Sequence, residues 1–357
     1  MSNKEVIKEL LDCFQNEADT PLEFDEEAIL LAYQKEDQKQ SISIKILSIF
    51  GGILASIAFL GFLFISGLYS SDISLLVLGG VLIVTSIWLN KKSDRIVMDT
   101  FSVSAFIIGF ILLGFGCLQF KVSDNILSII FIIIAFASLN IVQNYILSFI
   151  AVLIINGSIL TLIISNNLYN IIPIYIAAIG MMMTYLFLKE GKIITINKTL
   201  SKLYNPVKIG LIFSFLIGLI FLGKKGILPI DANYNWLSSI IIIPLIVYII
   251  TILFKVINVQ NTSHKIGIYI FTILILLSTA LSPAISGAFL IILLSFFVNY
   301  KTGFVIGIIS FIYFIFQFYY DLNFTLLTKS IILFSTGLLF IVFYLFTYKK
   351  LKANENV

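Results

Sequence analysis

From Ile46 onward, apolar runs of about 14 to 23 residues alternate with short polar breaks. About 20 consecutive apolar residues form a helix that crosses the roughly 30 Å hydrocarbon core of a bilayer. The pattern therefore predicts an all-α, polytopic bundle of transmembrane helices with about twelve spans. The predicted spans are Ile46 to Leu68, Ile73 to Leu89, Phe101 to Gln119, Ile126 to Leu139, Tyr145 to Ser165, Leu168 to Leu188, Ile209 to Leu222, Leu237 to Phe254, Ile266 to Leu281, Pro283 to Val298, Gly303 to Tyr319 and Ser330 to Tyr348.

These spans divide into two sets of six on either side of a long basic break. A faint period of about 160 residues relates the sets, as in transporters that are built from parallel repeats. The expected organisation is a head at 1–45, a first membrane half at 46–188, a basic cytoplasmic linker at 189–208, a second membrane half at 209–348 and a cytoplasmic tail at 349–357.

The head at 1–45 has no long apolar run and holds 11 acidic and 5 basic side chains. Val6, Leu10 and Phe14 recur at helical spacing, and Thr20 followed by Pro21 is typical of a helix start. The head also lacks the apolar stretch of a secretory signal. We expect an acidic helical segment in the cytoplasm, either a small hairpin under the membrane or a module that docks a partner.

Composition and charge agree with a membrane protein. Hydrophobic residues make up 59% of the chain and charged residues 12%, against roughly 45–50% and 25% in soluble domains. With the head inside, 17 Lys and Arg side chains fall in cytoplasmic segments and 4 on the opposite side. Because positive residues are retained in the cytoplasm, both termini are expected there. The excess of Lys and Arg indicates membrane orientation, and no nucleic-acid partner is expected.

Few residues offer chemistry. No charge lies near the centre of a predicted span, where buried charges mark proton pathways and catalytic sites. His264 stands alone in a predicted loop, and Cys13 and Cys117 are far apart, so neither a metal site nor a disulfide is expected. Asp94, Arg95 and Asp99 share a cytoplasmic break and are the remaining enzymatic candidates, although a charged loop that fixes orientation is the simpler interpretation. We expect no enzyme, no metal and no cofactor.

One group of candidate site residues surrounds the fifth span. Asn140, Gln143 and Asn144 form an uncharged break before this span, and Asn156 lies well inside it. Amides at membrane depth need hydrogen-bond partners. These side chains are therefore expected either to pair between helices or to line a polar cavity.

A second group lies in the turn between the last two spans. Tyr320, Asp321, Asn323 and Lys329 make this turn rich in hydrogen-bonding groups, and it is expected on the outer side. Asp321 is interpreted either as a polar anchor that neighbours in the same turn hold, or as a solvated turn residue.

Small residues and prolines inside the spans predict features of packing. Gly79 and Gly80 permit helices to approach closely. Pro173 and Pro244 lie inside apolar runs, and we expect them to kink their helices by removing a backbone donor.

Two short segments carry a resemblance to a known family. The sequence YYDLNFTLLTKS before the last span, and LNKKSD followed by Asp99 after the second span, resemble the bacterial membrane-protein family of domain of unknown function 4401. The likeness extends from about Lys45 to Lys350. It implies no known activity, but it suggests a bacterial inner membrane and a partner membrane protein.

Two classes of function remain open. A transporter-like or lipid-handling protein would use the many spans and a polar interior, whereas a scaffold or accessory subunit would use the acidic head and need no buried charge. In both cases the protein is expected to act by binding, with the lipid bilayer and another membrane protein as partners, and to perform no covalent chemistry.

Overall fold

The computed structural model describes residues 42–67, 72–92, 96–142, 144–224, 234, 236–256, 262–280 and 282–321, with shorter pieces at 325–328, 330–331, 334–335, 338 and 341. The predicted acidic head and the predicted cytoplasmic tail lie outside the described residues, apart from residues 42–45, which begin the first helix.

Every regular element of the described chain is helical, which confirms the all-α prediction for these residues. The elements are α3 (Ile42–Ile65), α4 (Asp72–Lys92), α5 (Ile96–Gln119), α6 (Asp124–Ile141), α7 (Tyr145–Ser165), the 3-10 turn η2 (Tyr169–Ile171), α8 (Ile172–Leu188), α9 (Glu190–Ile196), α10 (Lys198–Gly223), α11 (Trp236–Val256), α12 (Thr262–Ser278), α13 (Pro283–Phe297) and α14 (Lys301–Asp321).

Each predicted run from Ile46 to Tyr319 coincides with one of these helices, and the last run lies mostly outside the described residues. By length and composition, 8 helices of the described chain can cross a membrane: α4, α5, α6, α7, η2 with α8, α10, α11 and α14. Helix α13 is apolar but shorter. Twelve spans and a division into two halves therefore remain predictions.

The largest difference from the sequence prediction concerns α10. Its predicted apolar run begins at Ile209, yet the helix begins at Lys198 and has 26 residues. The residues that were assigned to a basic linker, 189–208, form α9 and the first part of α10. Because a helix needs no apolar surface to continue beyond the membrane, hydropathy marks the immersed part of α10 and misses its true start.

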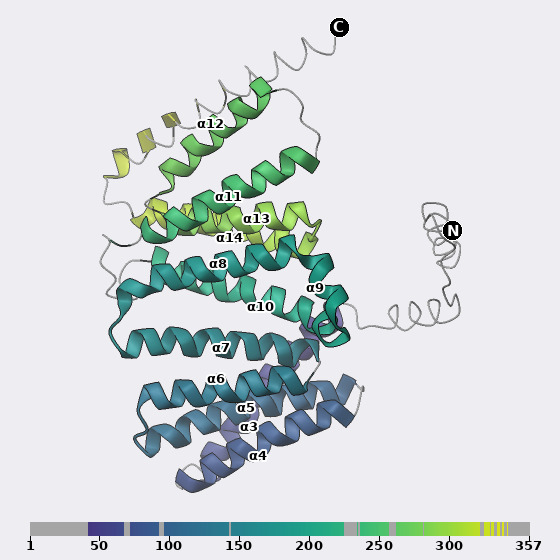
Figure 1. The fold of residues 1–357 in the computed structure, drawn as a ribbon. Helices are drawn as coiled ribbons and strands as arrows, with labels where there is room; N and C mark the ends of the chain where they lie inside the picture. The colour runs from purple at the N-terminus through teal and green to yellow at the C-terminus, as the bar shows by residue number, and fades with distance from the viewer. Residues whose placement is uncertain are drawn as a thin grey trace, which may run out of the picture.

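The helices lie side by side in one broad row, with α4 at one edge and α12 near the other (Figure 1). Helices α4 and α5, α6 and α7, and α13 and α14 pack as neighbouring pairs. Helix α10 is central, since it contacts α7, α8, α9, α13 and α14. The described residues form three hydrophobic cores. Phe106 and Leu147 belong to one that extends from α4 to α7, Phe215 and Ile246 belong to one among α8, α10, α11 and α13, and a smaller one lies among α3, α4 and α5. Helix α7 contributes to the first two, through Ala151 and Val152.

Helices α4 and α5 approach closely at two glycines. A Cβ at Gly79 would lie 2.8 Å from the backbone nitrogen of Leu113, and one at Gly109 would lie 2.9 Å from the carbonyl oxygen of Gly79. A Cβ at Gly80, in contrast, would meet nothing within 4 Å. The structure therefore assigns close packing to Gly79 alone of the predicted pair.

The prolines differ in their effect. Pro244 lies inside α11, as predicted. The expected kink at Pro173 is wrong, because α8 begins at Ile172 and this proline occupies its first turn. A backbone N–H in the first turn has no partner within the helix, so proline removes no hydrogen bond there. The described chain also has Pro206 inside α10.

Candidate functional site

The predicted outer turn is only partly described. Asp321 is the last residue of α14 and is half-buried, whereas Tyr320 exposes 75% of its surface. Asn323 and Lys329 lie outside the described residues. The interpretation of Asp321 as an anchor therefore stays a prediction.

The predicted amide break before α7 forms a polar junction between helices. Asn144 caps α7 by accepting from the backbone N–H groups of Ile146 and Leu147, and its side-chain amide donates to Asp99 at 3.2 Å. Asn90 of α4 donates to the same carboxylate oxygen at 3.3 Å. These contacts tie α4, α5 and α7 together through Asp99.

The other amides of that group have different surroundings. Asn140 donates to the carbonyl of Phe136 on its own helix at 2.9 Å, and Gln143 lies outside the described residues. Asn156 of α7 accepts a hydrogen bond from the hydroxyl of Tyr175 of α8 at 2.8 Å and donates to the carbonyl of Val152. Of the two alternatives for Asn156, the structure shows the pairing between helices.

The two predicted groups lie at opposite ends of the bundle. Gly210, in the first half of α10, packs against Val152 of α7, because a Cβ at Gly210 would lie 2.7 Å from the Val152 side chain. Val152 itself is about two helical turns beyond Asn144 on α7. At the other end of α10, a Cβ at Gly223 would lie 3.5 Å from Gln317, one turn before Asp321. Asp321 and the Asn144 junction therefore cannot form one site.

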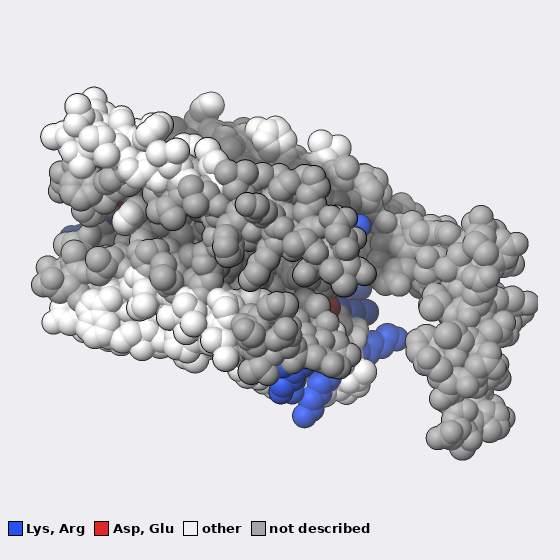
Figure 2. All heavy atoms as spheres, turned by 90° about the horizontal axis from the view of Figure 1, so that it is seen from above, with Lys and Arg blue, Asp and Glu red and all other residues white. Residues whose placement is uncertain are grey.

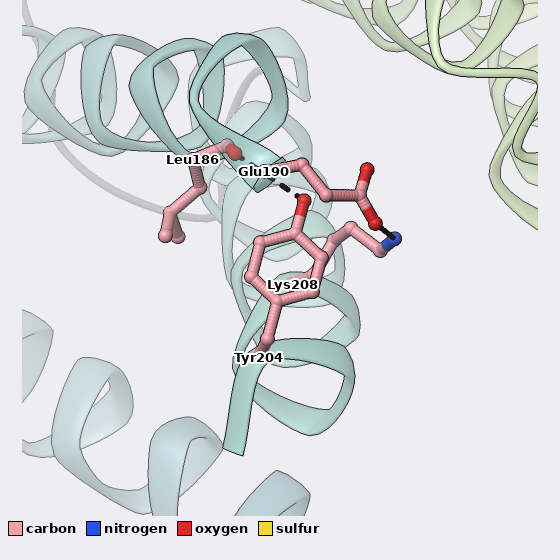
Figure 3. Close-up of polar contacts among 4 residues, drawn as sticks. All are labelled: Leu186, Glu190, Tyr204 and Lys208. Carbon is pink, nitrogen blue, oxygen red and sulfur yellow. Dashed lines mark hydrogen bonds and ion pairs between the residues drawn. The ribbon is translucent and has the colours of Figure 1, made fainter. Parts of the chain in front are cut away.

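The sequence prediction missed a buried ion pair at the end of the bundle where α10 begins. The ammonium of Lys208 lies 3.6 Å from a carboxylate oxygen of Glu190, and the two side chains expose 4% and 29% of their surface. Figure 3 shows the two side chains pointing toward each other, from α10 and from the start of α9. The hydroxyl of Tyr204 lies beside them and donates to the carbonyl of Leu186 at 3.2 Å.

Three aromatic rings surround the ammonium of Lys208. Its distance to the ring centroid is 4.4 Å for Tyr300, 4.7 Å for Tyr204 and 5.6 Å for Phe187. All three distances lie within the roughly 6 Å range of cation–π attraction. Burial raises the pKa of the Tyr300 hydroxyl, which is therefore neutral at ordinary pH. We call Glu190, Tyr204, Tyr300 and Phe187, with Lys208 between them, the lysine box.

Local sequence explains how the box forms. Tyr204 and Lys208 are four residues apart on α10 and therefore share a helix face. Glu190 is the first residue of α9, directly after α8, which carries Phe187, and Tyr300 directly precedes α14. The box thus joins the α8–α9 junction, α10 and the α13–α14 turn.

The ion pair of the box is loose. A charge-assisted hydrogen bond between nitrogen and oxygen is about 2.7–2.9 Å long, and the Lys208–Glu190 distance is 3.6 Å. The second carboxylate oxygen of Glu190 is buried and has no hydrogen-bond partner among the described residues. A buried acceptor without a partner destabilises a protein by about 1–3 kcal/mol.

Other buried polar atoms without a hydrogen-bond partner lie on the helices around the box. They are the hydroxyl oxygens of Ser214 on α10 and Ser295 on α13, and both amide atoms of Gln317 on α14. Ser86 of α4 and Ser102 of α5 differ, because each donates to the other's backbone carbonyl, at 2.7 and 2.8 Å. Ser86 and Ser102 thus satisfy each other across the α4–α5 contact, whereas Ser214, Ser295 and Gln317 have no such partner among the described residues.

The fold and these sites indicate the class of protein to which the chain belongs. The described chain is an apolar helical bundle of the kind that membrane proteins form, and its polar groups gather inside the bundle and at its ends. The model of a family described as a domain of unknown function, DUF4401, matches residues 42–350. The chain belongs to this family, which confirms the resemblance seen in the sequence. No curated protein matches the chain. No solved structure matches it either.

Proposed function

We propose that this DUF4401 protein is a multi-pass protein of the bacterial inner membrane, with about twelve spans and both termini in the cytoplasm. We propose further that it is transporter-like and binds a solute inside the bundle of α7, α8, α10, α13 and α14. It performs no covalent chemistry in this proposal.

The distribution of charge supports the orientation. Exposed lysines Lys192, Lys198, Lys202 and Lys301 lie on α9 or near the first residues of α10 and α14, at the end of the bundle that holds the lysine box. Figure 2 shows most of the Lys and Arg side chains in view gathered at one end of the molecule. The positive-inside rule assigns this end to the cytoplasm.

The single observation that carries the solute-binding proposal is the set of buried polar atoms on α9, α10, α13 and α14 that have no hydrogen-bond partner in the described part of the chain. Each such atom destabilises the protein by about 1–3 kcal/mol if nothing binds it. Side chains that act only in helix packing would satisfy one another, as Ser86 and Ser102 do. A polar solute that moves through the bundle would supply the missing partners.

Helix register supports a position near the middle of the proposed membrane span for one of these atoms. Helices α7 and α10 both run from the end of the box, and Gly210 faces Val152. Ser214 and Asn156 lie one turn beyond these two residues, so they are at about the same depth. Ser214 is thus the proposed lining of the solute site, and the Asn156–Tyr175 hydrogen bond holds α7 and α8 together at the same depth.

Thiol labelling tests this proposal without a known substrate. With Cys13 and Cys117 replaced, a Ser214→Cys variant in sealed vesicles is treated with a water-soluble thiol reagent. Labelling is expected, because the thiolate reacts only where water reaches it. Ile217→Cys, on the exposed apolar surface of α10, should stay unlabelled, and Lys121→Cys in an exposed turn should label fully. A Ser214 thiol as unreactive as that at Ile217 would contradict a solute path.

Scaffolding is the second candidate function, and the row of helices favours it. Helices α4, α6 and α14 have 22%, 17% and 17% of their apolar windows buried inside the bundle, so broad faces are open to lipid or to another membrane protein. An unreactive Ser214 thiol together with a membrane protein that co-purifies in defined proportion would support this candidate.

Reporter fusions test the orientation separately. Fusions within Lys192 to Lys202 and after Lys352 should both report a cytoplasmic position. An external signal from the first fusion would reverse the assignment of the box to the cytoplasmic side, and an external signal from the second would require an odd number of spans.

A further inference from the structure

We propose that the lysine box is a binding site for an organic ammonium ion, which Lys208 occupies from within the chain in this conformation. The inference rests on the proposed solute-binding function and names the class of solute: a protonated primary amine or a quaternary ammonium ion.

The composition of the box matches a cation. The faces of aromatic rings attract ammonium groups, and sites for quaternary ammonium ligands are commonly built from several such rings. Here the rings of Tyr204, Tyr300 and Phe187 lie 4.4 to 5.6 Å from the charge. Glu190 adds a carboxylate at 3.6 Å. An anion would be repelled by both the carboxylate and the ring faces.

The contacts of Lys208 indicate an occupant that can be displaced. Its ion pair is longer than a charge-assisted hydrogen bond, and the second oxygen of Glu190 has no partner. An incoming primary ammonium ion has three N–H groups and can donate to both carboxylate oxygens, whereas a quaternary ion has none and gains only the charge and ring contacts. Lys208 also has a flexible four-carbon stem that can carry its charge elsewhere.

Two cations cannot share the box, so the solute and Lys208 compete. Removal of the lysine charge should therefore strengthen the binding of a free amine. Lys208→Ala removes the three methylenes and the ammonium, a volume that n-propylammonium fills. Lys208→Met keeps most of the stem and removes only the charge.

The test uses the full-length purified protein in detergent, with n-propylammonium and tetramethylammonium as probes. 1-Propanol is the neutral control of matched size and propionate is the anionic control. Binding is measured by calorimetry and by the shift in unfolding temperature. We expect Lys208→Ala to bind n-propylammonium at least about tenfold more tightly than 1-propanol, because only the cation gains the ring and carboxylate contacts.

Matched variants locate the site. Lys202→Ala removes an exposed lysine six residues earlier on α10 and should bind n-propylammonium no better than the unmodified protein. Adding Glu190→Gln to Lys208→Ala should reduce the preference for the cation over 1-propanol, because only the ring contacts remain. If Lys208→Ala does not fold, Lys208→Met replaces it as the test variant. Lys208→Met should bind tetramethylammonium more tightly than the unmodified protein does.

Equal binding of n-propylammonium and 1-propanol to folded Lys208→Ala would overturn the proposal, as would an unchanged preference in the Glu190→Gln background. The result is separable from the proposed function. If ammonium ions bind but the Ser214 thiol is unreactive, the cation site is supported and the solute path is refuted. If the Ser214 thiol is reactive but no ammonium ion binds, the solute path is supported and the cation site is refuted.

Discussion

Breaking the Lys208–Glu190 pair should destabilise the protein by an amount that depends on which partner is removed. Lys208 exposes 4% of its side chain and Glu190 exposes 29%. Glu190→Gln leaves an ammonium buried among three rings without a counter-ion. Lys208→Met leaves a carboxylate that can turn toward water. We therefore expect Glu190→Gln to be the more destabilising change.

The structure gives approximate magnitudes. Two unit charges 3.6 Å apart attract each other by about 4–5 kcal/mol at an effective dielectric constant of about 20, and desolvation offsets most of this gain. Removal of one partner from a buried pair costs about 3–5 kcal/mol, and Glu190→Gln should approach the lower limit. Lys208→Met should cost about 1–2 kcal/mol, since the remaining carboxylate is partly solvated. The double variant should resemble Lys208→Met, because it leaves no buried charge.

The assay is thermal unfolding of purified protein in one detergent, with Lys202→Met as the control for loss of an exposed lysine on the same helix. The expected order of stability is control, then Lys208→Met, then Glu190→Gln. If Lys208→Met proved less stable than Glu190→Gln, the carboxylate would be the partner that depends on the pair, and the assignment of solvent access in the box would be wrong.

Two further predictions concern packing between helices. Gly79→Ala should destabilise the protein by about 1–3 kcal/mol, because its Cβ would meet backbone atoms at 2.8 and 2.9 Å that cannot move aside. Gly80→Ala, at an open position of the same helix, should change the stability by no more than about 0.5 kcal/mol in the same unfolding assay. Equal destabilisation by Gly79→Ala and Gly80→Ala would contradict the close packing at Gly79. In a double-mutant cycle, Asn156→Leu and Tyr175→Phe should couple by about 0.6 kcal/mol, up to about 1.7 kcal/mol. Additive effects would mean that their hydrogen bond contributes nothing.

The apolar runs predict where the helices lie, but they do not predict where every helix ends. A span is recognised because lipid demands an apolar surface over its whole length. Outside the lipid no such demand exists, and the sequence carries only weak helix signals. This is why α6 and α10 extend beyond their predicted runs. For Pro173 the apolar run begins at Leu168, but the first residues of that run form the 3-10 turn η2 and α8 begins only at Ile172. Hydropathy does not distinguish this turn from the helix.

The candidate site was less predictable than the fold, for a related reason. The hydropathy pattern predicts a basic linker at Lys208, because this residue directly precedes an apolar run and a lysine beside a run usually lies in water. Its burial depends on Phe187, Glu190 and Tyr300, which come from other segments. A local signal did exist in the four-residue spacing of Tyr204 and Lys208. That spacing becomes informative only once α10 is known to begin at Lys198.

The length of α10 gives a physical reason for a charge that can leave its site. At about 1.5 Å per residue, its 26 residues span about 39 Å, which exceeds the roughly 30 Å of hydrocarbon. Gly223 is 15 residues beyond Lys208, or about 22 Å. If Gly223 marks the outer edge of the hydrocarbon, Lys208 lies about 8 Å inside the inner edge. A lysine stem can snorkel its ammonium over most of such a distance. Lys208 therefore has two favourable environments, the box and the headgroup region, and an ammonium solute that fills the box would shift it toward the second.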